Sequence, residues 1–169
     1  MNRRQLLVSS VIVMLGLDAH AISAEEHNDP ALIKSMGSAK VTLQQGLAAA
    51  AQQGQPISGK FELEDGKLQL SVYVAKDGKF SEVIVDHASG KVAKTEAITE
   101  GEDLAAAKSQ SAAMAKAKAD LKAAADKAAA QTAGSQVVSI TPGLKGGRAV
   151  ASVTLLSGGQ YKSVEQPLE

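Results

Sequence analysis

Residues 61–74 have the sequence FELEDGKLQLSVYV, in which apolar and polar side chains alternate on both sides of Asp65-Gly66. Alternation with a period of two is typical of a β-strand with one buried face. An Asp-Gly pair between two such runs predicts a tight hairpin turn, because both residue types tolerate a positive φ. The longer run therefore puts four side chains on one apolar face: Leu68, Leu70, Val72 and Val74.

The next segment predicts two more strands. A second turn, Asp77-Gly78, precedes a strand over residues 80–86. Its run Val83-Ile84-Val85 is continuously apolar, which predicts burial on both faces of the sheet. Residues 86–90 are expected to form a turn, and Lys91-Val92 to start a short closing strand.

This strand region recurs at an offset of 81 residues, with no gap from Gln55 onward. A preserved apolar face matters, because a slip of one residue would turn every side chain to the other side of the sheet. The offset aligns that face with Ala149, Ala151, Val153 and Leu155. Leu43 aligns with Leu121 only at an offset of 78. We therefore expect two copies of a helix–strand–strand–strand unit.

The first helix has clear boundaries in the sequence. Thr42 and Gln45 have the spacing of a capping box, and Gly54 with Pro56 ends the helical pattern. Residues 25–40 show no apolar periodicity, so we expect a flexible leader there.

The second helix is expected to be long. Residues 104–131 contain no glycine or proline and consist mainly of strong helix formers. Their apolar stripe is thin, which leaves a break near Ser109-Gln110-Ser111 as an alternative. Thr99 and Glu102 are spaced as a second capping box within a polar linker over residues 96–103.

The N-terminal segment is typical of a signal peptide. Arg3 and Arg4 precede a twelve-residue apolar run, which is too short to span a bilayer of about 30 Å. Small residues then favour cleavage after Ala24. A membrane anchor is the alternative, and the arginine pair leaves the general and the twin-arginine export routes both open. We expect a periplasmic or secreted protein with no stable membrane span after cleavage.

Composition excludes several functional classes. Lys+Arg and Asp+Glu number 18 each, which argues against a nucleic-acid partner. The absence of cysteine excludes disulfides, thiolate metal sites and cysteine nucleophiles. His27 and His87 are the only histidines after the predicted cleavage site, and a metal site needs three or four converging ligands. We expect no catalytic, metal or cofactor site, and therefore no enzyme.

Charge is unevenly distributed in the part that follows residue 24. Residues 25–103 hold 8 basic and 13 acidic side chains, whereas residues 104–169 hold 8 basic and 4 acidic ones. An ordinary solvated surface is one interpretation. The other is that the two parts attract each other or present different faces to a partner.

The first copy resembles a PepSY domain. The similar parts are the Thr42-Leu43 helix start, the Glu64–Lys67 turn, the strand ending in Tyr73-Val74, and the run from Val85 through Gly90-Lys91-Val92. The second copy is less similar, with Gln166-Pro167 where Asp86-His87 stand in the first. The resemblance implies a helix packed on a small antiparallel sheet. It also implies, more loosely, inhibition or chaperoning of a peptidase.

These observations predict an α+β chain with two tandem copies of a helix on a three- to four-stranded antiparallel sheet. Its parts are a signal peptide (1–24), a leader (25–40), a first PepSY-like domain (41–95), a linker (96–103) and a second such domain with the long helix (104–169). The expected function is that of an exported, non-enzymatic binding protein, with a peptidase among its candidate partners. The alternative is an envelope protein with a structural or sensory role that binds a small ligand or wall component. The candidate partner-binding residues are Glu62, Glu64, Asp65, Asp86 and Lys91; the oligomeric state stays open.

Overall fold

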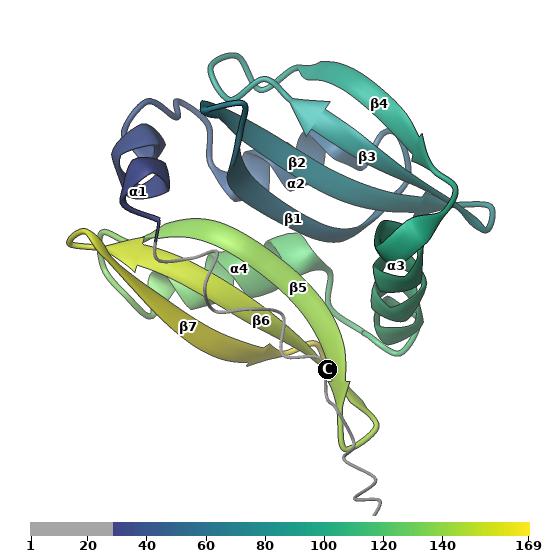
Figure 1. The fold of residues 1–169 in the computed structure, drawn as a ribbon. Coiled ribbons are helices and arrows are strands. Elements are labelled where there is room, and N and C mark those ends of the chain that lie inside the picture. The colour runs from purple at the N-terminus through teal and green to yellow at the C-terminus, as the bar shows by residue number, and fades with distance from the viewer. Residues whose placement is uncertain (1–28) are drawn as a thin grey trace, which may run out of the picture.

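The computed structural model describes residues 29–169 as four α-helices and seven β-strands (Figure 1). The helices are α1 (Pro30–Met36), α2 (Leu43–Ala50), α3 (Gly101–Met114) and α4 (Leu121–Ala130). The strands are β1 (Gln55–Glu64), β2 (Lys67–Lys76), β3 (Lys79–Val85), β4 (Val92–Ile98), β5 (Gln136–Lys145), β6 (Arg148–Ser157) and β7 (Gln160–Pro167). The predicted signal peptide and His27 lie outside the described residues. Within residues 29–169, none of the helices has both the length and the hydropathy needed to cross a bilayer.

All seven strands belong to one antiparallel sheet, in the order β4-β3-β2-β1-β5-β6-β7. β1 and β5 join its two halves, with Gly59 opposite Ile140 and Lys60 opposite Ser139. We call strands β1–β4 the first half and β5–β7 the second half. The expectation of a separate small sheet for each copy is therefore wrong. Pairing of β1 with β5 at these residues covers the middle of two strand edges that would otherwise expose unpaired backbone groups.

The predicted hairpin turns are confirmed. Asp65 and Gly66 have φ angles of 50° and 73°, and Asp77 and Gly78 have φ angles of 51° and 73°. Positive φ at both central residues is the geometry that matches the right-handed twist of the flanking strands. Leu63 then lies opposite Leu68, which fixes the register of the first hairpin.

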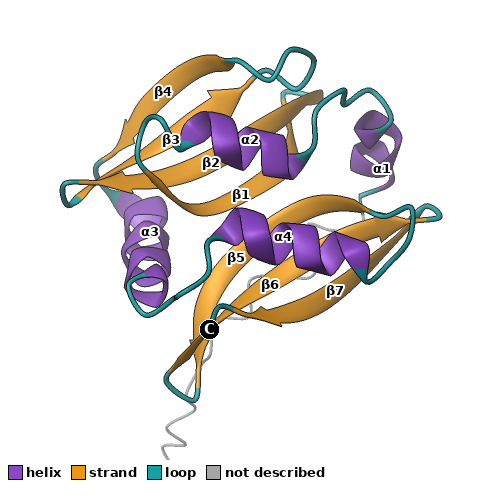
Figure 2. Cartoon of the chain, turned by 180° about the vertical axis from the view of Figure 1, so that it is seen from behind, coloured by secondary structure: helices purple, strands orange, loops and turns teal. Residues whose placement is uncertain are grey.

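The apolar faces of the two long strands are buried as predicted. Leu70, Val72 and Val74 of β2 are buried, and so are Ala149, Ala151, Val153 and Leu155 of β6, whereas Leu68, the fourth residue of the predicted face, is only half-buried. Figure 2 shows α2 and α4 on the same side of the sheet, and their buried residues belong to one continuous core with these strands. We call the opposite side of the sheet the open face, although α3 packs on its centre, where Gln110 Oε1 accepts a 2.8 Å hydrogen bond from Ser58 Oγ.

Burial of β3 on both faces is not observed. Val83 and Val85 are buried, whereas Ile84 between them is only half-buried. Val83 lies opposite Val72 and Val85 opposite Leu70, so both valines face the side that α2 covers. Ile84 projects from the open face, where burial is incomplete.

The start of α2 is confirmed in detail. Thr42 accepts a hydrogen bond from the backbone N–H of Gln45, and the Gln45 side chain accepts one from the backbone N–H of Thr42. This reciprocal pair satisfies two of the helix's free N–H groups.

The prediction of a single long helix over residues 104–131 is wrong. α3 ends at Met114 and α4 begins at Leu121. The chain breaks there because the backbone N–H groups of Lys118 and Ala119 donate to the carbonyl of Leu168, and Asp120 caps α4 by accepting from the N–H of Ala123. These bonds come from tertiary structure and from a cap, which outweigh a uniform helix propensity.

Two other boundaries also differ from expectation. α1 lies inside the predicted leader, and its Leu32 and Met36 are buried. β4 continues to Ile98, inside the predicted linker. The N-cap of α3 is Glu100 with no side-chain hydrogen bond, so the Thr99–Glu102 capping box is wrong.

Candidate functional site

Glu62 is held within the sheet rather than free at the surface. Its Oε2 lies 2.6 Å from Lys60 Nζ, and its Oε1 accepts a 2.7 Å hydrogen bond from Ser71 Oγ. Ser71 Oγ in turn accepts a 3.0 Å bond from Gln69 Nε2. The Glu62 side chain keeps only 25% of its surface exposed. Its carboxylate therefore balances Lys60 and orders the open face, which limits what it can offer a partner.

Glu64 and Asp65 occupy the tip of the β1–β2 hairpin. Both are exposed, and Glu64 lies opposite Lys67 in the strand register. The tip therefore presents two carboxylates and one ammonium group on a short, well-defined turn.

Asp86 shapes the turn between β3 and β4. Its Oδ1 accepts hydrogen bonds from the backbone N–H groups of Ala88 (3.2 Å) and Ser89 (2.6 Å). Hydrogen bonds from Ser89, first from its side chain and then from its backbone, lower the pKa of Asp86 below its ordinary value. Gly90 closes the turn with a φ of 74° and an N–H that donates to the Asp86 carbonyl.

The β1–β2 tip and the β3–β4 turn lie at the same end of the first half. Leu70 pairs with Val85, so the chain leaving β3 runs past the start of β2. Asp86 and Lys91 are both exposed, as Glu64 and Asp65 are. The structure thus brings four of the five candidate residues to one end, which we call the acidic end. Glu62 lies behind it, on the open face.

His87 ties this end to α2 through its backbone. Its carbonyl accepts from the N–H groups of Lys40 (2.9 Å) and Val41 (3.1 Å), just ahead of the helix cap. The Leu168 carbonyl accepts from Lys118 and Ala119 in the same way ahead of α4. Leu168 therefore occupies the position in the second half that His87 occupies in the first. The alignment of Gln166-Pro167 with Asp86-His87 is wrong by one residue, because the offset of 81 aligns Pro167-Leu168 with them.

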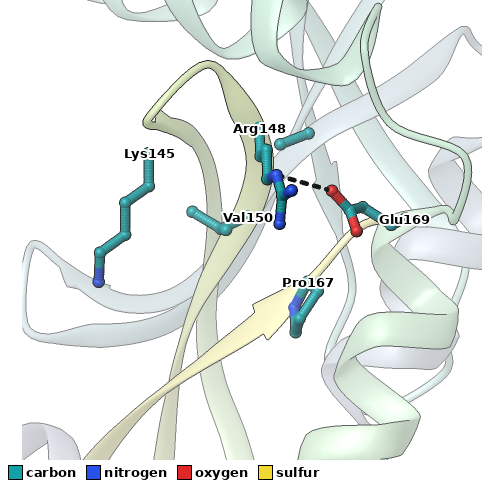
Figure 3. Close-up of a pocket in the computed structure, with 6 residues that line it drawn as sticks. Lys145, Arg148, Val150, Pro167 and Glu169 are labelled. Carbon is teal, nitrogen blue, oxygen red and sulfur yellow. Dashed lines mark ion pairs between the residues drawn. The ribbon is translucent and has the colours of Figure 1, made fainter.

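The second half carries a shallow hollow at the corresponding end (Figure 3). It measures about 220 Å³ and is lined by Lys145, Arg148, Ala149, Val150, Pro167 and Glu169. Arg148 Nε lies 3.6 Å from Glu169 Oε1, and Lys145 Nζ lies 2.6 Å from Glu165 Oε2. Both cations are largely exposed and each is paired with a carboxylate, so the hollow offers an apolar floor with two ion pairs at its rim.

The described part of the chain brings no three His, Asp or Glu side chains close enough to hold a metal ion. His87 is half-buried, and its Nδ1 is buried without a hydrogen-bond partner. Its imidazole and the Asp86 carboxylate are adjacent in the turn, but Asp86 is engaged by backbone N–H groups. The Asp86 carboxylate therefore shapes the turn.

Comparisons with family models, with curated proteins and with solved structures find no match for this chain. The resemblance to PepSY domains therefore stays a prediction from the sequence.

Proposed function

We propose that the protein is an exported, non-enzymatic binding protein whose protein partner docks at the acidic end of the first half. The observation that carries the proposal is the convergence of two exposed turns at one end of the sheet. They present Glu64, Asp65 and Asp86, with Lys67 and Lys91 beside them. A fixed cluster of exposed carboxylates attracts a basic surface and raises the rate of association with it.

The second half supplies an internal contrast. The tip that corresponds to Glu64-Asp65-Gly66-Lys67 is Lys145-Gly146-Gly147-Arg148. The two hairpin tips therefore differ in charge: the first carries two carboxylates and one lysine, whereas the two cations of the second are paired with Glu165 and Glu169. A partner with a basic surface is therefore attracted more strongly to the first tip than to the second.

We infer that the two halves are tandem copies of one unit. β1 pairs with β2 and β5 with β6 in the same register at an offset of 81, and both pairs have an irregularity at the same point, Pro56/Ser58 and Val137/Ser139. At the junction, Gly59 faces Ile140, its own counterpart at that offset. Met36 and Leu43 match Met114 and Leu121 at an offset of 78. The unit therefore has two helices ahead of its strands, of which the sequence predicted only one.

A peptidase is the partner class that the PepSY resemblance implies. The export of the protein rests on residues 1–24 alone. N-terminal sequencing of exported material would support it with a mature end at Glu25, whereas intact Met1 in cytosolic protein would contradict it.

The binding test compares three proteins as bait in envelope extract. The wild type is set against Glu64→Gln with Asp65→Asn, which removes two charges and keeps residue types that the turn accepts. The matched control is Glu100→Gln with Glu102→Gln, which removes two exposed charges beyond β4, at the other end of the strands. The proposal predicts a partner that the wild type and the control retain and the tip variant loses. Equal recovery by all three folded proteins would contradict it.

The hollow in the second half favours the alternative function, binding of a small ligand or wall component. Lys145 and Arg148 flank the apolar Val150 and Pro167 there (Figure 3). A rise in melting temperature with anionic wall fragments, abolished by Arg148→Gln, would favour this function. No shift with any such fragment would leave the acidic end as the better candidate.

A further inference from the structure

The exposed edge strand β4 has an unusual internal symmetry. Residues 93–97 have the sequence AKTEA. Placed antiparallel to a second copy and centred on Thr95, this segment sets Lys94 against Glu96 twice, alanine against alanine twice, and Thr95 against itself. From this complementarity we propose that two copies of the chain associate through β4, edge to edge, about a two-fold axis at Thr95.

β4 is accessible for such pairing. It is the outermost strand next to β3, and residues 92–97 are exposed in the part of the chain that the structure describes. The side chains of Lys94 and Glu96 keep 60% and 47% of their surface exposed. No helix of the described residues covers either face of the strand at these positions, so a second sheet can approach in plane. The free N–H and C=O groups of an edge strand are a template for this pairing.

The faces of the strand also fit. Lys94 lies opposite Ile84 and Glu96 opposite Glu82, so both charged side chains project from the open face. A two-fold axis perpendicular to the sheet preserves faces, so Lys94 and the partner's Glu96 meet on the same side. Opposite charges that face each other across antiparallel strands stabilise the pair.

A second copy would offset a repulsion that the single chain contains. Glu96 lies directly opposite Glu82 in the β3–β4 register, and like charges in that position are destabilising. Glu96 meets Lys94 of its own strand at 2.7 Å. In the dimer a second ammonium group, from the partner's Lys94, approaches Glu96 from the outer side.

The other edge of the sheet lacks this complementarity. Lys162 and Glu165 of β7 are an odd number of residues apart, so they project from opposite faces and cannot pair across a two-fold axis. Pro167 also removes one backbone donor from β7. β4 is therefore the edge that fits a second copy.

The pairing is expected to be short. The register between β3 and β4 shifts between Ile84 and Val85, at Ala93, which is the first residue of the proposed pairing, and such an irregularity limits regular pairing beyond it. A contact of about five residues per chain is smaller than a standard interface, which has about 20–30 residues on each side. The dimer should therefore be weak and depend on protein concentration.

Charge variants test the proposal by analytical ultracentrifugation at low salt. The wild type should show a reversible monomer–dimer equilibrium. Lys94→Glu and Glu96→Lys should each weaken it by about tenfold or more, which corresponds to about 1.4 kcal/mol. The double variant K94E/E96K should restore it, and an equimolar mixture of the two single variants should form heterodimers. Lys162→Glu on β7 is the matched control and should leave the equilibrium unchanged.

A crosslink gives an independent measurement. The chain has no cysteine, so Thr95→Cys introduces a single thiol. Opposed residues in an antiparallel pair have Cα atoms about 4.5–5.5 Å apart, within the range that a disulfide spans. Oxidation should link Thr95→Cys into dimers much faster than Ser163→Cys, the control on β7. Monomeric wild type up to about millimolar concentration, or dimerisation that Lys162→Glu abolishes and Lys94→Glu does not, would overturn the proposal; so would equal crosslinking of the two cysteine variants.

Discussion

The close packing of α2 on the sheet allows a quantitative prediction for a substitution at Gly46. A Cβ atom added there would lie 2.5 Å from Cδ2, 3.1 Å from Cγ and 3.4 Å from Cδ1 of Leu70. Leu70 is fully buried, so its side chain has little room to move away. Overpacking of this kind costs about 1–3 kcal/mol. Alanine is about 1 kcal/mol better than glycine inside a helix. Since three carbon atoms of Leu70 are crowded, we expect the upper part of that range, and Gly46→Ala to destabilise the protein by a net ~1–2 kcal/mol.

The same substitution should have the opposite sign once Leu70 is truncated. Leu70→Ala alone should cost about 2–5 kcal/mol through lost burial and a cavity. In that background Gly46→Ala meets no obstacle and should stabilise by up to about 1 kcal/mol. The second half already has this combination, because Ala124 and Ala151 stand at the positions of Gly46 and Leu70, and both are buried.

Urea denaturation of the four proteins provides the double-mutant cycle. The expected result is a lower midpoint for Gly46→Ala in the wild type and a higher one in Leu70→Ala, with similar slopes. A raised midpoint for Gly46→Ala in the wild-type background would refute the packing of α2 against Leu70.

Buried, ion-paired and titrating side chains each make a distinct contribution to stability that a substitution can test. Val72→Asp and Val153→Asp should each cost several kcal/mol, because both valines are fully buried at the centre of a long strand; a chemical-denaturation midpoint that hardly moves would show that the face is wrongly assigned. Glu62→Lys should destabilise the protein measurably, because it replaces the partner of Lys60 and Ser71 by a like charge; Glu64→Lys, at the exposed tip, should stay within about 0.5 kcal/mol in the same assay. Asp86 has a lowered folded-state pKa, so its ionised form stabilises the fold above the unfolded pKa of about 3.9, and this contribution is lost as pH falls through the lower folded value. The difference in melting temperature between the wild type and Asp86→Asn should thus be largest near neutral pH and shrink in acid; a constant difference would count against a role for the charge.

The strand pattern was predictable because local signals and tertiary structure agree. Asp65-Gly66 and Asp77-Gly78 define the turns, and alternation along β2 and β6 defines the buried face. Because the pattern repeats at an offset of 81 residues, the same hairpin and the same strand register could be predicted for the second half. Period-two alternation has one solution when one face carries the apolar side chains of the core, because a slip of one residue would turn them to the other face.

The helices were harder to predict, for different reasons. The break before α4 depends on the carbonyl of Leu168, which is about 50 residues away in the sequence and visible only in the fold. α1, by contrast, had a local signal: Asp29 caps it and Pro30 occupies its first turn, a typical helix start. The seven-residue helix is too short to show clear apolar periodicity, which is why the segment resembled a loop.

The candidate site was predictable in part. Exposed turn residues such as Glu64 and Asp65 follow from the hairpin itself. The engagement of Glu62 by Lys60 and Ser71 does not, because it depends on a neighbouring strand and on which face each residue occupies. The symmetry of AKTEA was present in the sequence, but its meaning requires the knowledge that β4 is an exposed edge strand.

Association kinetics measure the role of the acidic end most directly. The partner retained by the wild type would be passed over immobilised protein at about 20 mM and about 150 mM salt, where the Debye length falls from about 20 Å to about 8 Å. The account predicts that the association rate of the wild type drops steeply with salt, while that of Glu64→Gln with Asp65→Asn is low and nearly independent of salt, and dissociation rates change little. The Glu100→Gln with Glu102→Gln control should behave as the wild type. Identical association rates and salt dependence for the wild type and the tip variant would contradict docking at the acidic end.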